Sequence, residues 1–425
     1  MISSRLAAAR RAEEEGRTGT INGERPLFHL TPPLGWMNDP NGFSFYKGKY
    51  HLFFQYNPYS VHWDTMHWGH AVSEDLLEWS YLPAALAPDM PYDAGGCFSG
   101  CAVELPDGRQ MLMYTGLEPL PDAGSLPEGF QNLQAQCIAV GDGIDYVKPE
   151  ENPVIGTDML PAGAGKCDFR DPKIIILRDG TYLVLAVNRA EDGDGQILMY
   201  RSRDGFKWKY WKPLLQNHGR FGTMWECPDL FELDGKWVLL LSPMEMQPEN
   251  GKYSNGHGTV ALVGEFDQEN GSFVWENDQP LDSGIDFYAA QTVQAPESAI
   301  RCQRHCREKY ASKKEPQGSF LLFYPSAENS AEKVSFFRGG RPGPDPAGNI
   351  FGQPAGRQCP KGHPPGAIRR RRAWQLGHPP GAIRRRRAWQ LGSFARRHQE
   401  KMGLMASERA SFSACAAARS LPRVV

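Results

Sequence analysis

One unit recurs four times between Asp39 and Ser242, and this recurrence constrains the possible fold more than any other feature. In each copy an acid-bearing polar segment leads into an apolar strand, a turn with glycine, and a second apolar strand. Further strand-like runs, such as 69–73 and 196–202, lie between the copies. The turns follow one another at similar intervals along the chain and fall at Gly48, Gly108, Gly180 and Gly235.

A unit of about four strands repeated at this period is typical of a β-propeller blade. Helical periodicity is absent between residues 27 and 300, which argues against an α/β barrel. The innermost strands of a propeller surround its axis, so acids at their starts gather at one end of the channel. The sequence therefore predicts an all-β fold in which Asp39, Asp171 and Glu226 meet, although they lie far apart along the chain.

The two ends of the chain differ from this strand-rich region. The segment 1–26 is charged and Ala-rich, and it predicts a short surface helix around Ser4–Glu15. The segment 301–425 holds 25 Lys and Arg against 7 Asp and Glu, a net charge of about +18, whereas the segment 1–300 carries about −20. We therefore predict an N-terminal extension over 1–26, a propeller over 27–300 and a basic tail over 301–425.

The basic tail contains a perfect tandem copy, in which residues 363–377 are repeated as 378–392. Each copy carries four consecutive arginines, and such a segment does not build a packed core. It could act as a nucleic-acid or nuclear-import patch. We favour a solvated tail or a frameshifted reading frame, because the charge and the strand pattern change together within a fifth unit. No nucleic-acid partner is therefore expected.

Cysteine usage and hydropathy indicate the compartment. The nine cysteines are odd in number and scattered, which fits reduced thiols better than a disulfide framework. No apolar stretch reaches the roughly 18 residues needed to span a bilayer, and the N-terminal segment lacks the apolar centre of a secretory signal. The sequence predicts a cytoplasmic protein without a membrane partner.

The recurring acids suit glycoside hydrolysis, which uses one carboxylate as nucleophile and one carboxylic acid to protonate the leaving oxygen. Glu226 lies between Trp225 and Cys227, an apolar setting that favours the protonated form. Asp39 lies beside Asn38 in an Asp-Pro-Asn-Gly turn, where free amides favour the ionised form. Taken alone, that turn is explained by turn chemistry, whereas Asp171 with its neighbouring arginine fits a surface ion pair as well as it fits a functional role.

Taken together, these segments resemble glycoside hydrolase family 32, in particular its sucrose-6-phosphate hydrolases and invertases. The resemblance covers roughly residues 25–300, and its seven motifs occur in order. They are Trp36-Met37-Asn38-Asp39-Pro40-Asn41-Gly42, Phe54-Gln55-Tyr56-Asn57-Pro58, Trp68-Gly69-His70, Phe98-Ser99-Gly100, Phe169-Arg170-Asp171-Pro172, Trp225-Glu226-Cys227-Pro228-Asp229 and Asp286-Phe287-Tyr288-Ala289-Ala290-Gln291.

The resemblance implies a five-bladed propeller and retention of configuration at the fructosyl C2. It implies Asp39 as nucleophile, Glu226 as acid/base, and Asp171 as the acid that holds sugar hydroxyls and stabilises the transition state. Trp68 is close to Trp63 and the register of that loop is ambiguous, and Trp63 is the tryptophan assigned to the site. The residues implied to line the fructose site are Asn38, Gln55, Trp63, Phe98, Ser99 and Arg170.

Two features of the family pattern are missing from the sequence. The family completes its fifth blade and adds a C-terminal β-sandwich, but neither pattern appears after residue 300. We therefore expect an incomplete fifth blade and no sandwich. No cofactor or metal is expected; His62, His67 and His70 form a plausible zinc ligand count, but the resemblance makes their segment a carbohydrate-facing aromatic loop.

The function predicted is hydrolysis of the β-fructofuranosidic bond of sucrose 6-phosphate or sucrose, a small-molecule carbohydrate. Three alternatives remain: an inactive truncated or frameshifted fragment, nucleic-acid binding through the arginine-rich tail, and an inverting arabinan-cleaving propeller. The Trp-Glu-Cys-Pro-Asp motif argues against the last of these. The sequence does not indicate an oligomeric state.

Overall fold

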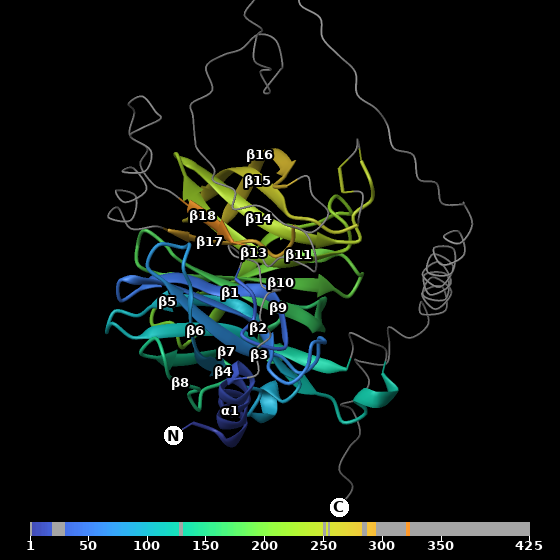
Figure 1. The fold of residues 1–425 in the computed structure, drawn as a ribbon. Helices are drawn as coiled ribbons and strands as arrows, with labels where there is room; N and C mark the ends of the chain where they lie inside the picture. The colour runs from blue at the N-terminus through green and yellow to red at the C-terminus, as the bar shows by residue number, and fades with distance from the viewer. Residues whose placement is uncertain are drawn as a thin grey trace, which may run out of the picture. The chain divides into compact units, whose positions relative to one another are not determined.

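The structure is a computed structural model, and it describes residues 2–18, 30–126, 131–249, 252–253, 256–282 and 287–294 together with the backbone of 320–323. Apart from one N-terminal helix and three short 3₁₀ helices, the regular structure of these residues consists of β-strands (Figure 1). Most of the predicted basic tail, its tandem repeat included, lies outside them.

The predicted N-terminal helix is confirmed as α1 (Ser4–Thr18). Ser3 caps it, because its Oγ accepts a hydrogen bond from the Leu6 backbone N–H at 3.1 Å. The helix packs on β4 (Ser80–Leu86): Arg10 Nε donates to the carbonyl of Ala84 at 3.0 Å, and Glu13 Oε2 accepts from the Ala84 N–H at 3.0 Å. Residues 19–26 of the predicted extension lie outside the described residues.

Four antiparallel sheets of four strands follow one another along the chain, each a simple meander. The first comprises β1 (Trp36–Tyr46), β2 (Lys49–Asn57), β3 (His67–Ser73) and β4; the second β5 (Gly96–Glu104), β6 (Gln110–Pro119), β7 (Asn132–Gly141) and β8 (Tyr146–Val147). The third comprises β9 (Ala164–Ile176), β10 (Tyr182–Ala190), β11 (Gly195–Ser202) and β12 (Lys209–Gln216); the fourth β13 (Met224–Leu233), β14 (Lys236–Met244), β15 (Val260–Asp267) and β16 (Ser272–Pro280). Among the described residues, short 3₁₀ helices are formed by η1 (Pro91–Asp93), η2 (Ala123–Ser125) and η3 (Thr157–Met159).

The first strands of the four sheets are neighbours around a common axis. Strand β5 contacts β1 and β9, and β9 in turn contacts β13. A further strand, β17 (Gln291–Gln294), contacts both β13 and β1 and pairs with β18 (Phe320–Phe323). This arrangement confirms the predicted all-β propeller, with four complete blades in the part of the chain that the structure describes.

Strand β18 differs from the prediction. It lies beyond residue 300, where the sequence analysis ends the propeller. The run Phe-Leu-Leu-Phe is a short apolar segment inside a basic region, too short to stand out by periodicity. The predicted boundary therefore leaves one paired strand in the tail.

Glycine turns connect the first and second strands of every blade, as predicted. Gly48, Gly108, Gly180 and Gly235 all have φ between 79° and 82°, a left-handed conformation that glycine adopts without steric cost. A Cβ at Gly48, Gly108, Gly180 or Gly235 would meet no neighbouring atom within 4 Å, so backbone conformation rather than space explains the residue type.

Aspartates organise the turns between the third and fourth strands. Asp75 Oδ1 accepts hydrogen bonds from the backbone N–H groups of Leu77 and Glu78, both at 2.9 Å. Asp204 Oδ1 does the same for Phe206 and Lys207, at 2.9 and 2.8 Å. The equivalent turns of the second and fourth blades use Asp142 and Asp267. The blades thus share a local turn chemistry as well as a strand order.

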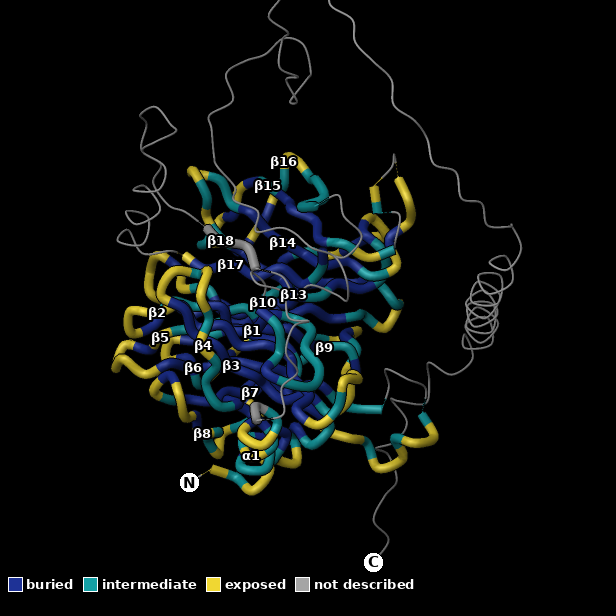
Figure 2. Tube along the Cα trace, in the orientation of Figure 1, coloured by how far each residue is buried: buried dark blue, intermediate teal, exposed yellow. Residues whose placement is uncertain are grey.

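The hydrophobic core lies between the sheets, and Figure 2 shows that buried residues run along the strands of the blades. One cluster joins the third and fourth blades through Leu185, Trp225 and Leu239. Another joins the second and third blades through Met113, Phe169 and Leu198. Each blade therefore depends on its neighbours for burial, and this packing fixes the relative positions of the inner strands that carry the predicted acids.

Candidate active site

The three predicted acids come together from three different blades. Asp39 lies on β1, Asp171 on β9 and Glu226 on β13. The thiol of Cys227 lies between two of them, with its Sγ 3.9 Å from Asp39 Oδ2 and 3.8 Å from Asp171 Oδ2. Glu226 is close enough to both aspartates to raise the pKa of each through charge repulsion. This is the meeting point that the spacing of the motifs predicts.

The backbone at this end of the inner strands is irregular, and the irregularity positions the acids. Register shifts interrupt β1 between Asn41 and Ser44 and β13 between Glu226 and Asp229. Asp171 and Cys227 have φ of 57° and 49°, a conformation that side chains other than glycine rarely adopt. Both residues precede proline, which further restricts their backbone. Strain of this kind persists where the surrounding structure enforces it, and it concentrates at functional sites.

Asp39 is half-buried and held by hydrogen bonds. Ser99 Oγ donates to its Oδ2 at 2.7 Å, and the Asn38 side chain also bonds to it. Asn38 is itself oriented by the indole N–H of Trp36, which donates to Asn38 Oδ1 at 2.9 Å. These contacts come from β1 and from β5 of the next blade, so packing of two blades orients the carboxylate.

The electrostatic setting of Asp39 differs from the prediction. Burial, followed by repulsion from Glu226, raises the pKa of Asp39 to about 6, and the hydrogen bonds from Ser99 and Asn38 only partly oppose this. The local amide of Asn38 does favour the ionised form, but burial and Glu226 outweigh it, so the net shift is opposite to the one expected from the turn alone. The sequence shows the local donors but not the desolvation or the second acid from another blade.

Asp171 is 5% exposed and is fixed by groups from two neighbouring blades. Its Oδ2 accepts from the Cys227 backbone N–H at 3.0 Å, and its own N–H donates to Thr115 Oγ1 at 3.0 Å. Burial raises the pKa of Asp171; Arg170 opposes the shift, while Glu226 and Asp39 add to it. The alternative of a surface ion pair is therefore wrong, because Arg170 and Asp171 are both buried.

Glu226 has polar partners on both carboxyl oxygens. Oε1 accepts from Arg170 Nε and Nη2 at 3.2 and 3.1 Å, and Oε2 lies 2.5 Å from the phenol oxygen of Tyr288. The Trp225 side chain, by contrast, is fully buried in the core. The predicted apolar setting is therefore wrong, because successive side chains on a strand point to opposite faces.

Arg170 connects the acids. Its guanidinium contacts Glu226, lies 4.0 Å from Asp171 Oδ2, and donates through Nη1 to Asp168. Burial disfavours its charge, but the carboxylates of Glu226, Asp168 and Asp171 outweigh that effect and raise the pKa of Arg170. A permanent cation is thus placed among the carboxyl groups of the site.

The remaining predicted residues surround the acids at different depths. Gln55 is buried, and its Nε2 donates to the carbonyl of Cys97 at 3.0 Å. Trp63 is 56% exposed and its ring meets Phe98 edge to face at 5.9 Å, whereas Trp68 is fully buried and donates its indole N–H to the Phe98 carbonyl at 3.0 Å. Trp63 is therefore the one of the two tryptophans with an accessible ring.

The histidines considered as metal ligands are separated by burial. His62 is exposed, while His67 and His70 are buried, and His70 Nε2 lies 3.0 Å from His51 Nδ1. In the part of the chain that the structure describes, no group of three or more His, Cys, Asp or Glu is arranged to hold a metal ion. Among the same residues, no helix combines the length and apolarity needed to cross a membrane.

Tyr288 and Asp168 are among the residues near the acids that are missing from the predicted site. Tyr288 lies in a quoted motif, yet its role appears only when β13 and the segment before β17 are brought together. Asp168 bonds to Arg170 and also accepts from Arg189 Nε at 2.7 Å. The sequence contains a signal for Asp168, because it lies two positions before Arg170 on the same strand and alternate residues of a strand share a face.

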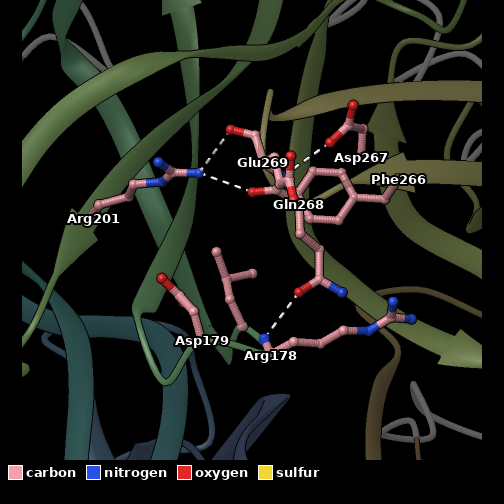
Figure 3. Close-up of a pocket in the computed structure, with 8 residues that line it drawn as sticks. Arg178, Asp179, Arg201, Phe266, Asp267, Gln268 and Glu269 are labelled. Carbon is pink, nitrogen blue, oxygen red and sulfur yellow. Dashed lines mark hydrogen bonds between the residues drawn. The ribbon is translucent and has the colours of Figure 1, made fainter.

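One hollow lies elsewhere. It has a volume of about 520 Å³ and is lined by the turn after β9, by Arg201 on β11 and by the β15–β16 turn (Figure 3). Arg201 Nη2 donates to the Gln268 carbonyl at 2.9 Å there, and the Arg178 N–H donates to Gln268 Oε1 at 3.0 Å. These contacts join the third and fourth blades, and the hollow contains none of the three acids.

Comparison with known proteins agrees with this geometry. The model of the glycosyl hydrolases family 32 N-terminal domain matches residues 29–306, and the chain belongs to this family. A sucrose-6-phosphate hydrolase of Zymomonas mobilis subsp. mobilis is 39% identical over 279 residues, covering 64% of this chain and 52% of the relative. One from Escherichia coli is 37% identical over 301 residues, covering 69% and 60%.

Among solved structures, the chain is again similar to members of family 32. A mutant of the family 32 beta-fructofuranosidase of Bombyx mori in complex with sucrose has a TM-score of 0.64 and 34% identity, covering 78% of this chain and 64% of that one. The chain spans about half to three fifths of the length of the curated relatives given above.

Proposed function

We propose that this chain is a retaining β-fructofuranosidase that hydrolyses sucrose 6-phosphate or sucrose through a covalent fructosyl-enzyme intermediate. The observation that carries the proposal is the convergence of Asp39, Asp171 and Glu226 from three blades around one arginine. Glycosidases that retain configuration use two carboxyl groups, one as nucleophile and one as acid/base. The names of the relatives provide the sugar class.

Asp39 is the nucleophile in this proposal. With a pKa of about 6 it is mostly ionised at pH 7, as attack on the fructosyl C2 requires. The hydrogen bond from Ser99 occupies Oδ2 at 2.7 Å and holds the carboxylate in one orientation. Its raised pKa also makes the carboxylate more basic than an exposed one.

Glu226 is the acid/base, and the hydrogen bonds of Tyr288 support this role. The phenol oxygen lies 2.5 Å from Glu226 Oε2 and 3.0 Å from the Ser242 carbonyl, but a phenol has one hydrogen to donate. If Tyr288 donates to the carbonyl, both contacts are satisfied only when Glu226 carries a proton on Oε2. That proton is the one that the departing sugar oxygen needs.

Asp171 and Arg170 complete the site. We assign Asp171 to the sugar hydroxyls and to stabilising the positive charge that develops on the ring. Asn38, Gln55, Phe98, Ser99 and Trp63 line the fructose site in the proposal. The exposed ring of Trp63 beside Phe98 supports a place at its rim.

The experiment that tests the proposal is an assay with sucrose and sucrose 6-phosphate in parallel. We expect release of glucose or glucose 6-phosphate by the wild-type chain and none by Asp39→Asn. Absence of release from both substrates by a folded wild-type chain would overturn the proposal. The relative rates on the two substrates decide whether the 6-phosphate is recognised.

The proposal extends to the organisation of the chain. We assign β17 and β18 to a fifth blade, supported by the contacts of β17 with both β13 and β1. The propeller then occupies the predicted 27–300 together with β18, between an N-terminal extension and a basic tail. A reducing, cytoplasmic compartment is supported by cysteines in the described part of the chain that are buried and form no disulfide: Cys97, Cys101, Cys137 and Cys227.

A further inference from the structure

We propose that Asp168 is a positioning residue for the reaction, which holds Arg170 in place and, together with Arg189, sets how strongly that arginine acts on Glu226. The inference rests on the proposed function, because it concerns the acid/base of that reaction. The four side chains form one row of alternating charge, from Glu226 through Arg170 and Asp168 to Arg189.

The two edges of the Arg170 guanidinium face different carboxylates. Nε and Nη2 point to Glu226 Oε1 at 3.2 and 3.1 Å, while Nη1 points to Asp168 Oδ1. The other oxygen of Asp168 accepts from Arg189 Nε at 2.7 Å. Asp168 is therefore fully engaged between two cations, and it limits the share of the Arg170 charge that acts on Glu226.

The backbone at Asp168 is also fixed. Asn188, which is fully buried, donates its Nδ2 to the Asp168 carbonyl at 2.9 Å and to the Gly165 carbonyl at 2.7 Å. Gln196 Nε2 in turn donates to Asn188 Oδ1 at 2.9 Å. Three neighbouring strands of the third blade thus fix the backbone from which the Asp168 side chain reaches Arg170.

The two arginines keep Asp168 ionised. Burial opposes the ionised form of Asp168, but Arg170 and Arg189 outweigh it and hold the pKa of Asp168 below its usual range. The titratable and charged groups that face Glu226 are Asp39 on β1, Arg170 and Asp171 on β9, Cys227 on β13 itself, and Tyr288.

Two substitutions have opposite expected effects. Asp168→Asn keeps the shape but removes a negative charge, so Arg170 acts more strongly on Glu226 and favours its ionised form. Arg189→Gln removes the cation that neutralises Asp168 and favours the protonated form. We expect the alkaline limb of the pH–rate profile to move down by about 0.5–1 pH unit in the first variant and up by a similar amount in the second. We also expect kcat to fall about tenfold in Asp168→Asn, with KM changing less.

A second measurement does not depend on turnover. The pH titration of the Glu226 carboxyl carbon is followed by NMR, with the signal assigned by its loss in Glu226→Gln. Asp192→Asn and Arg203→Gln, exposed charges on the same blade, serve as matched controls and should leave both measurements unchanged.

Opposite shifts in the two variants support the proposal. The proposal is overturned if the two variants shift the titration of Glu226 in the same direction, or if a variant that remains folded shows no shift. If only one variant folds, its predicted direction of shift still tests the proposal. A wild-type chain that titrates normally but cleaves no fructoside would contradict the proposed function, while the NMR shifts would still decide the role of Asp168.

Discussion

Aspartates occur at both ends of the blades, and the comparison shows what distinguishes a structural acid from a functional one. In the outer turns Asp75 and Asp142 accept backbone N–H bonds, which lower their pKa values. On the inner strands burial raises the pKa of Asp39 and Asp171, with like charges nearby. The same residue type therefore stabilises the fold in one place and costs stability in the other.

The largest effect is expected from Asp39→Asn. Activity on a fructoside should fall by about 10⁴-fold or more, because the nucleophile is removed. The free energy of unfolding at pH 7 should rise by about 1–2 kcal/mol, since a half-buried charge near Glu226 disappears. Steady-state kinetics and urea unfolding measure the two quantities. Loss of activity accompanied by loss of stability would contradict the comparison.

Glu226→Gln should lower kcat by about 10²–10⁴-fold on sucrose, as expected for removal of a general acid. On a fructoside whose leaving group needs no protonation, the rate of the first step should fall less in this variant. The comparison of the two substrates by stopped-flow or steady-state rates is the measurement. Equal losses on both would argue against a role as acid.

Tyr288→Phe should lower kcat by about tenfold, because Glu226 Oε2 loses its short contact at 2.5 Å. Tyr146→Phe is a matched control, since its phenol donates to Gln110 away from the acids. We expect the control to keep its kinetics. A similar loss in both variants would show that the effect is structural.

The pH dependence separates the two kinds of aspartate. The pKa of Asp39 is about 6 in the folded protein, against an ordinary 3.8. Between these two pH values the folded protein binds a proton at Asp39 that the unfolded chain has released. The contribution of Asp39 to the free energy of unfolding therefore falls as pH rises through this window. A lowered pKa, as at Asp75, acts in the opposite direction: its stabilisation is lost as pH falls through the folded value. Activity should also decline below about pH 6 as Asp39 is protonated.

The check is thermal unfolding from pH 4 to 7. The gain in Tm of Asp39→Asn over the wild type should grow with pH across this range. A gain that shrinks as pH rises would contradict the assignment of a raised pKa to Asp39.

The smallest effect is expected from Asp75→Ala. It should cost about 1 kcal/mol of stability, since two backbone N–H groups lose their acceptor, and it should leave kcat unchanged. Denaturant unfolding and a sucrose assay measure both. A loss of activity without unfolding would link the outer turns to the site and weaken the comparison.

The sequence predicts features that depend on local chemistry. Glycine turns such as Asp107-Gly108, the recurrence of strands and the acids of the motifs all depend on neighbouring residues, and the structure places them as expected. The meeting of Asp39, Asp171 and Glu226 also follows, because a propeller fixes where strand starts lie.

Features that depend on contact between blades could not be predicted in this way. The raised pKa of Asp39 comes from burial and from Glu226, an acid on a different blade and distant in the chain. The partners of Glu226 come from β9 and from the segment before β17. The choice between Trp63 and Trp68 needed the burial of each ring, which local pattern does not provide.

The most direct test of the account is to trap the covalent intermediate. Glu226→Ala is incubated with β-fructofuranosyl fluoride, whose leaving group needs no acid, and the quenched protein is digested and sequenced by mass spectrometry. Without its base the enzyme should accumulate the intermediate, so we predict one fructosyl unit on Asp39. A folded variant that carries no label, or carries it on Asp171 or another residue, would contradict the account.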